Sequence, residues 1–267
     1  MKNKIFMSAI AILLLVSCSQ KKRLAQHFVE RSEGVKVAFY VPGELLKVNL
    51  RNDVVPAELD TLSEEEKTAY LEKQIKIINK VDDAKFIDIF YFSMEKELRA
   101  YGLDVEYWNS DSIPADSTRW VIDVPKIEVT EFVEDQRAAA IYYNEKVYVT
   151  VPVDVINVAT WFNLSDGLTN ETVFAEQNYC NEFDGYFDVD ENGKVYAKIF
   201  ADSIDLDGFY RFGTMLGKLY AGYCYDYLMN GYVDKHLTEI DTVSKYRFDP
   251  YEKYFFKTET DRLVKMK

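Results

Sequence analysis

KVYVTVPVDV, residues 146–155, is the stretch that decides the fold. Valine stands at every second position, and the residues between the valines are mostly polar: Val147, Val149, Val151, Val153 and Val155 against Lys146, Tyr148, Thr150 and Asp154. A strict period of two is typical of a long β-strand with one face in a core and the other outside it. The sequence therefore predicts a sheet of long, mainly antiparallel strands.

A second long strand precedes this one. Its apolar residues alternate up to Pro125 and then resume one residue out of phase: Trp120, Ile122 and Val124, then Ile127 and Val129. Proline cannot donate a hydrogen bond to a neighbouring strand, so this slip predicts a bulge or an edge position at Pro125. We place the turn between the two long strands at residues 134–137, which makes them an antiparallel pair.

Shorter β segments are predicted elsewhere. Residues 34–42 are dense in β-branched and aromatic side chains, and residues 103–107 alternate. Residues 186–189 and 195–200 flank Asn192-Gly193, the dipeptide that best suits a hairpin turn requiring positive φ. We therefore expect a second hairpin at this point of the chain.

Three segments have helical periodicity. Ser63 and Glu66 have the spacing of a capping box at the start of a helix over residues 64–81. The next helix begins near Asp83 and ends at Gly102, which can serve as its left-handed cap. The last helix covers residues 209–233, and its stripe of small residues predicts close packing against the sheet: Gly213, Gly217 and Ala221.

The predicted fold class is thus α/β in the α+β sense, a mainly antiparallel sheet packed by two to three amphipathic helices. A composition of 48% hydrophobic and 15% aromatic residues indicates a folded chain. We expect a single domain over residues 33–235, followed by a charged C-terminal extension over residues 236–267.

The first residues have the pattern of a secretion signal. Lys2 and Lys4 precede an apolar run over residues 5–16, and Leu15-Val16-Ser17 stands directly before Cys18. The run has twelve residues, whereas crossing a bilayer takes about 20. The segment resembles the signal peptide and lipobox of a bacterial lipoprotein. An unmodified cysteine behind an ordinary secretion signal is the alternative.

The lipoprotein resemblance implies a membrane anchor. Residues 1–17 would be removed, Cys18 would carry several acyl chains including palmitate, and residues 18–32 would be an acylated polar tether. Ser19 stands where some Gram-negative bacteria use aspartate for retention in the inner membrane. The resemblance therefore favours the outer membrane, with the domain facing the periplasm of the cell envelope.

Two further cysteines, Cys180 and Cys224, form a candidate disulfide pair in an oxidising periplasm. Cys180 falls in a strand or loop and Cys224 in a helix, and nothing in the sequence places their Cα atoms within bonding range. Two free buried thiols are the other reading.

Charge and residue content exclude several functions. The formal net charge is −13, and it becomes −15 when Lys2 and Lys4 leave with the signal peptide, so nucleic acid is not an expected partner. Only two histidines are present, and no nucleophile, P-loop or dinucleotide motif occurs. We expect no enzyme activity, no catalytic residue, no cofactor and no metal site. A carboxylate pair of the glycosidase type stays open, since sequence spacing does not test it.

One acidic stretch imitates half of a calcium loop. Residues 188–193 place oxygen-bearing side chains before a glycine, but Ile199 stands where such a loop needs its bidentate glutamate. We interpret the stretch as a hairpin turn.

Aromatic residues are the remaining candidates for a binding surface. The chain has 20 Tyr, 17 Phe and 3 Trp, and many of them fall on amphipathic periods typical of a core. Four fall at expected strand ends or loops and form a candidate interaction patch: Tyr142, Tyr143, Trp161 and Phe162. Such a patch would contact a protein partner or a glycan.

The order of elements also resembles a class of envelope proteins. A lipidated cysteine is followed by a strand, a helix ending in Glu97-Leu98-Arg99-Ala100-Tyr101-Gly102-Leu103, two long β segments and a final helix. This order resembles the auxiliary lipoproteins of ABC-type transport systems and secretion-associated α/β lipoproteins. The resemblance implies a non-enzymatic accessory or scaffold in an envelope transport or assembly complex, with an envelope protein as partner. A glycan-binding lipoprotein is the alternative.

Overall fold

The structure is a computed structural model. It describes residues 20–51, 62–107, 119–142, 145–167, 170–180, 183–201, 203–237 and 244–266. Cys18 and Tyr143 lie outside the described residues.

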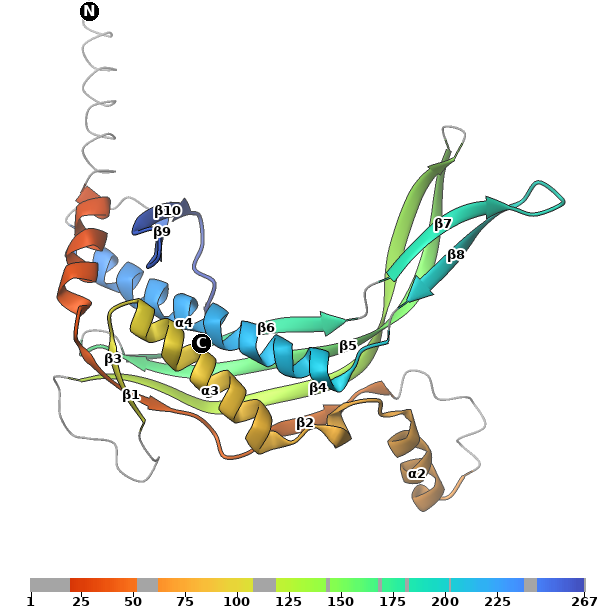
Figure 1. Cartoon of the computed structure of the whole chain (residues 1–267), viewed down its shortest axis with the longest axis horizontal. Coiled ribbons are helices and arrows are strands. Elements are labelled where there is room, and N and C mark those ends of the chain that lie inside the picture. Colours follow the sequence, from red (N-terminus) through yellow and green to blue (C-terminus); the bar gives the residue numbers. More distant parts are fainter. Residues whose placement is uncertain are drawn as a thin grey trace, which may run out of the picture.

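A seven-stranded sheet forms the centre of the molecule (Figure 1). Its order is β11-β6-β5-β4-β1-β3, and β2 also pairs with β4. The strands are β1 (Lys36–Tyr40), β2 (Leu46–Asn49), β3 (Asp104–Tyr107), β4 (Trp120–Tyr142), β5 (Glu145–Ser165), β6 (Asn170–Cys180) and β11 (Val264–Lys265). The β4–β5, β5–β6 and β6–β11 pairs are antiparallel, whereas β1 is parallel to β3 and β4, and β2 is parallel to β4.

Helices α3 (Asp83–Ala100) and α4 (Leu206–His236) pack on one face of this sheet and confirm the predicted fold class. Helix α2 (Glu64–Gln74) projects away from the sheet, and the short 3-10 helix η3 (Ile78–Lys80) lies between α2 and α3 in the chain. The capping box forms, because the Ser63 amide donates to the Glu66 carboxylate over 3.0 Å and the Glu66 amide donates to Ser63 Oγ over 3.4 Å. Gly102 ends α3 with φ +88°, as predicted.

The stripe of small residues on α4 packs against α3, whereas the sequence predicted a sheet as its neighbour. Beside Gly217 lie the Phe90 carbonyl and the Met94 amide, both backbone groups of α3, and Phe86 lies beside Gly213. Only glycine lets the two helix backbones approach this closely.

Residues 20–32 are helical, so the expected tether over residues 18–32 is wrong for this part. Ala25, Phe28 and Ser32 are fully buried, and the Phe28 ring stacks on Trp120 at 5.3 Å between centroids. The charged run that suggested a linker is one turn of a helix whose other side is apolar. The folded domain therefore begins at least as early as residue 20.

The segment predicted as a charged extension also belongs to the fold. Strands β9 (Lys245–Asp249) and β10 (Tyr254–Thr258) form a hairpin, and β11 joins the edge of the main sheet beside β6. Tyr246, Phe248 and Leu263 are buried in the main core. The apolar residues are widely spaced among charged ones, which concealed this contribution in the sequence.

The two long strands are longer than predicted and leave the body of the molecule together. The β4 pairing to β5 continues without a turn through residues 134–137 and reaches Tyr142 opposite Glu145. The pairing slips between Asp123 and Lys126, which confirms the bulge predicted at Pro125. Polar residues at 134–137 are strand residues on a ribbon that projects from the body, where solvent reaches them.

A second hairpin accompanies this ribbon. Its strands are β7 (Phe183–Val189) and β8 (Val195–Ala201), and Gly193 has φ +77° in the predicted turn. We call the outer ribbon, residues 132–142 and 145–154, together with β7 and β8 the arm. Figure 1 shows the arm at one end of the molecule and the helical segment 20–32 at the other, with the arm tip and the beginning of that segment on the same side of the main sheet.

The valine stripe forms a core of its own. Val151, Val153 and Val155 are buried with Ile199 of β8 packed against them, separate from the main core. The main core uses the opposite face of β5, beginning with Ile156 and Val158. Consecutive residues of β5 point to opposite faces, so the strand supplies one core on each side where the body meets the arm.

Candidate functional site

The outer face of the β7–β8 hairpin is the candidate site. Residues directly opposite each other in an antiparallel pair share a face, and Tyr186 pairs with Lys198 while Asp188 pairs with Tyr196. Phe200 follows on the same side of β8. Since Ile199 points toward the valines of the ribbon, these side chains point away from it.

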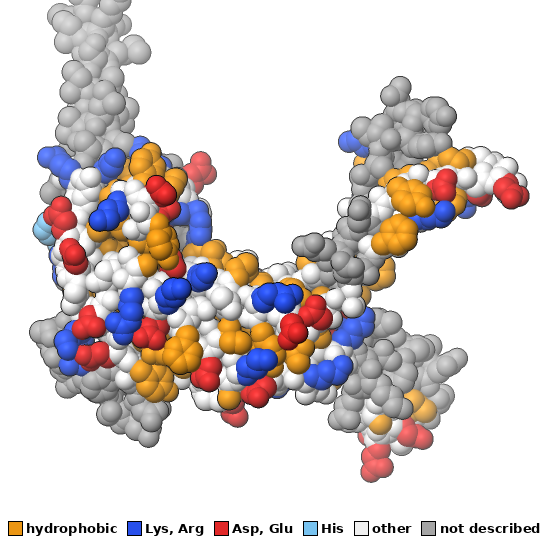
Figure 2. All heavy atoms as spheres, viewed as in Figure 1, with side chains coloured by type: hydrophobic (Ala, Val, Ile, Leu, Met, Phe, Trp, Pro, Cys, Tyr) orange, Lys and Arg blue, Asp and Glu red, His pale blue; other side chains and the backbone are white. Residues whose placement is uncertain are grey.

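Three aromatic rings on this face are open to solvent. Phe200 is 62% exposed, Tyr186 is 51% exposed and Tyr196 is 38% exposed. The Tyr186 and Phe200 rings lie 6.1 Å apart between centroids. Figure 2 shows hydrophobic side chains gathered along the arm beside charged ones. We call these three rings, with Lys198 and Asp188, the arm face.

A charged pair stands between the rings. Lys198 Nζ lies 3.1 Å from Asp188 Oδ2, and 5.5 and 5.7 Å from the Tyr186 and Tyr196 ring centroids. The hydrogen bond from Lys198 is the main reason that the pKa of Asp188 lies below its usual value, and the same bond raises the pKa of Lys198. The face thus presents aromatic surface around an ionised pair at neutral pH.

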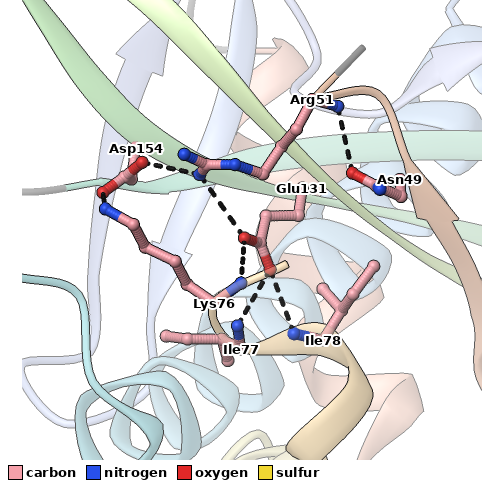
Figure 3. Close-up of polar contacts among 7 residues, drawn as sticks. All are labelled: Asn49, Arg51, Lys76, Ile77, Ile78, Glu131 and Asp154. Carbon is pink, nitrogen blue, oxygen red and sulfur yellow. Dashed lines mark hydrogen bonds and ion pairs between the residues drawn. The ribbon is translucent and has the colours of Figure 1, made fainter. Parts of the chain in front are cut away.

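A buried carboxylate marks the base of the arm (Figure 3). Glu131 of β4 is 0% exposed, and its two oxygens accept the backbone N–H groups of Lys76, Ile77 and Ile78 at 2.7, 3.0 and 3.0 Å. A helix continuing from α2 would direct these N–H groups to its own carbonyls. Glu131 takes them instead, which explains why the predicted helix over residues 64–81 is divided into α2 and η3.

Asp154 of β5 completes this cluster. Arg51 Nη1 lies 2.6 Å from Asp154 Oδ1 and 3.4 Å from Glu131 Oε1, and Lys76 Nζ contacts Asp154 Oδ2. Burial acts to raise the pKa of Asp154, but the hydrogen bonds from Lys76 and Arg51 outweigh it and hold the pKa below its usual value. Two cations and two carboxylates therefore connect β4 and β5 to the segments around them just where the ribbon leaves the body. We call these four residues the base cluster.

The sequence predicted a different position for Asp154. It was assigned to the face of β5 outside the core, yet its residue surface is only 8% exposed. Burial requires the two cations, which come from parts of the chain more than 75 residues away. Strand periodicity alone does not reveal such partners.

The predicted interaction patch does not form as one surface. Phe162 is fully buried in the main core, which contradicts the prediction, because it lies on the face of β5 that the helices cover. Trp161 is half-buried under Lys126, whose Nζ lies 3.7 Å from the ring centroid. Tyr142 ends β4 at the far end of the ribbon, and Tyr143 lies outside the described residues.

The candidate disulfide is not formed, and Cys180 and Cys224 are both free thiols. Cys180 is the last residue of β6 and is half-buried, whereas Cys224 is fully buried within α4. Burial raises the pKa of the Cys224 thiol. Cys224 is therefore an unreactive part of the main core.

The described part of the chain holds no group of three or more metal-ligating side chains. Within the same residues, no helix has the length and apolar character needed to cross a membrane.

The sequence predicted the hairpin but not its arm face. A two-residue turn at Asn192-Gly193 would set Tyr186 opposite Ile199, whereas the observed loop has three residues, since the Asp190 amide donates to the Lys194 carbonyl, and Tyr186 lies opposite Lys198. The sequence also lacked the layer beneath, since nothing local shows that Ile199 packs on the valines of β5.

The comparisons with known proteins provide no family for this chain. No model of a protein family matches it, and a search of curated proteins finds no match either. The candidate site therefore stands on its own geometry: an exposed aromatic face on an arm whose base is fixed by buried ion pairs.

Proposed function

We propose that the protein is a membrane-anchored, non-enzymatic envelope lipoprotein that serves as an accessory or scaffold in a transport or assembly complex. The sequence around Cys18 supports the anchor, with the outer membrane and its periplasmic side as the location. The observation that carries the contact role is the arm face, three exposed aromatic rings on one side of a projecting hairpin.

Exposed rings favour association because burying them removes apolar surface from water. Burial of apolar area contributes about 25 cal/mol per Å², and contiguous exposed apolar patches mark interaction sites. The base cluster joins the ribbon to the body, and Ile199 packs the hairpin onto the valines of the ribbon before binding. A surface ordered in advance loses less conformational entropy when a partner binds.

A protein partner fits this face. Tyrosine and phenylalanine are enriched in protein interfaces, and the ionised pair of Lys198 and Asp188 can set the orientation of a partner through complementary charges. The partner should present an apolar patch with a polar rim.

Crosslinking in native membranes tests the contact. We expect the double substitution Tyr186→Ala/Phe200→Ala to reduce the yield of the crosslinked partner at least tenfold in pulldowns of the full chain. The matched control is Tyr254→Ala/Phe256→Ala, which removes an equally exposed tyrosine and phenylalanine from β10. Equal yields from wild type and the arm variant would contradict the proposal.

The alternative partner is a glycan, because exposed rings also stack on sugars. Binding of wild type to purified envelope glycans, lost in the arm variant and kept in the β10 variant, would assign the arm face to glycans instead.

The anchor is tested separately. We expect Cys18→Ala to move the protein from the membrane fraction to the soluble periplasmic fraction. A variant that still fractionates with membranes after a salt wash would refute the anchoring role of Cys18.

A further inference from the structure

A cavity of about 700 Å³ lies beside α3, away from the arm. Its walls are the chain after β1, at Pro42 and Gly43, the end of β3 at Tyr107, and one side of α3. Strands β1 and β3 are parallel, so their carboxyl ends meet here. Ligands of open α/β sheets commonly bind outside the carboxyl ends of the strands, and this volume lies in the range of small-molecule sites.

Helical spacing places four functional side chains of α3 in this cavity. The residues Tyr91, Phe92 and Glu95 follow Asp88 by three, four and seven positions, which puts all four on one side of the helix. Phe90 and Met94 are buried on another side of the helix, whereas Asp88 and Phe92 are exposed and Tyr91 lies buried at the cavity wall.

Three aromatic rings meet at nearly right angles in this cavity, with Tyr91 between Phe92 and Tyr107. Phe92 meets the Tyr91 ring at 72° with 5.3 Å between centroids, and Tyr107 meets it at 85° with 5.2 Å. Tyr91 is buried and packed on Phe39, whereas Phe92 and Tyr107 are 62% and 59% exposed. A rigid inner ring is therefore flanked by two open rings approximately perpendicular to it.

The charge of the cavity is negative. No cationic side chain lines it among the described residues. Glu95 is already engaged, with Arg99 Nε at 3.1 Å and Nη2 at 2.9 Å from its Oε1. Asp88 is exposed and has no hydrogen bond or ion pair within the described part of the chain. The Asp88 carboxylate is thus available to a ligand at the entrance.

We propose that this cavity binds a small organic cation of the alkylammonium class. Aromatic faces attract cations through the negative potential above each ring, and cages of two or three rings are a common way to bind quaternary ammonium groups. The two rings flanking Tyr91 provide such faces, and Asp88 supplies the opposite charge. A neutral ligand of the same shape would gain the apolar contact but neither electrostatic interaction.

Calorimetric titration of the full chain with choline tests this proposal, with 3,3-dimethyl-1-butanol as the neutral probe of the same shape. We expect saturable choline binding that is at least tenfold tighter than binding of the neutral alcohol. Asp88→Asn should weaken choline binding at least fivefold and leave the neutral alcohol unaffected. Tyr107→Leu, which keeps apolar volume but removes the aromatic face, should weaken choline binding in the same way.

Glu65→Gln is the matched control, because it removes an exposed carboxylate from α2 and should not change choline binding. Circular dichroism shows whether each variant is folded. Absence of saturable choline binding, equal affinity for the neutral alcohol, or full affinity in Asp88→Asn would each overturn the proposal. None of these outcomes depends on the arm face or on Cys18.

Discussion

Three polar side chains of α4 attach the C-terminal hairpin, and Asp226 is the most buried carboxylate among them. Asp226, Asn230 and Asp234 are four residues apart and lie on one side of the helix. Asp226 accepts the Phe248 amide over 3.0 Å, Asn230 accepts the Tyr246 amide over 2.8 Å, and Asp234 pairs with Lys245 at 2.5 Å. The helix thus replaces the neighbouring strand that β9 would otherwise need on this edge.

This attachment makes stability depend on pH. Burial raises the pKa of Asp226 to about 7, against the hydrogen bond from the Phe248 amide and the attraction of Arg262 and Arg247, and with a smaller contribution from the Asp261 charge. Between about pH 4, the usual value of an unfolded Asp, and pH 7 the folded chain keeps a proton that the unfolded chain releases. The contribution of Asp226 to stability therefore falls as pH rises through this window.

We expect Asp226→Asn to remove this dependence while keeping an oxygen that accepts from Phe248. The difference in unfolding free energy, Asp226→Asn minus wild type, should become about 1–3 kcal/mol larger from pH 4 to pH 8. Urea denaturation at each pH measures it. The control Asp207→Asn changes an exposed carboxylate at the beginning of α4 and should show no such increase. A constant difference between Asp226→Asn and wild type across this range would contradict the assignment.

At the scale of elements, the contact between α3 and α4 depends on glycine. A Cβ atom at position 217 would lie 2.5 Å from the Phe90 carbonyl oxygen and 2.9 Å from the Met94 amide nitrogen. Both are backbone atoms of α3 on the side that packs against α4, so neither can move alone. The two helices would have to separate.

Gly217→Ala should therefore lower the free energy of unfolding by about 1–3 kcal/mol, even though alanine in a helix is intrinsically favoured by about 1 kcal/mol. Thermal and urea unfolding measure the effect. Gly222→Ala in the same helix should cost less, because its new Cβ would meet the phenol oxygen of Tyr101, the far end of a side chain. Equal losses in the two variants would show that helix packing is not the cause.

The elements with local signals were predicted and the others were not. The capping box at Ser63, the cap at Gly102, the bulge at Pro125 and the turn at Gly193 each have a chemical cause within a few residues. The predicted turn at residues 134–137 was wrong because a ribbon with solvent on both sides has the composition of a loop. Segment 20–32 was missed because its lysines dominate, although Ala25, Phe28 and Ser32 follow helical spacing.

For the whole molecule, the base cluster decides how the arm joins the body. Arg51, Lys76, Glu131 and Asp154 come from four segments, and no sequence pattern connects them. This is the part of the candidate site that sequence could not predict, since burial of charge depends on partners brought together only by the complete fold. The hairpin of the arm face, in contrast, has a local turn signal, although its register depends on the three-residue loop that the structure shows.

Removing one member should leave an unpaired buried charge. We expect Asp154→Ala to lower the free energy of unfolding at pH 7 by about 3 kcal/mol, because Arg51 then loses its closest partner. The pKa of Asp154 is lowered, so its contribution is complete above about pH 4 and is lost as pH falls through the folded value. Urea unfolding at pH 7 and pH 3 should therefore show a smaller difference at the lower pH.

Glu128→Gln is the control for this prediction. Glu128 is on the neighbouring strand β4 and forms a more exposed pair with Lys126, so its loss should change the unfolding free energy by less than about 1 kcal/mol. A similar loss in both variants would mean that burial of the base cluster does not increase its contribution to the free energy of unfolding.

The continuity of β4 and β5 has a mechanical consequence. Strand β4 has 23 residues, which at about 3.3 Å per residue gives a length along the chain near 75 Å, from Trp120 within the sheet to Tyr142 in the arm. No loop interrupts the two strands between the tip and the sheet on which segment 20–32 packs. A pull on the tip would load both strands together and shear the backbone hydrogen bonds that join them to β1 and β6 in the sheet. An attachment ahead of residue 20 would therefore hold one end of the molecule while the continuous strands carry a force applied at the other end.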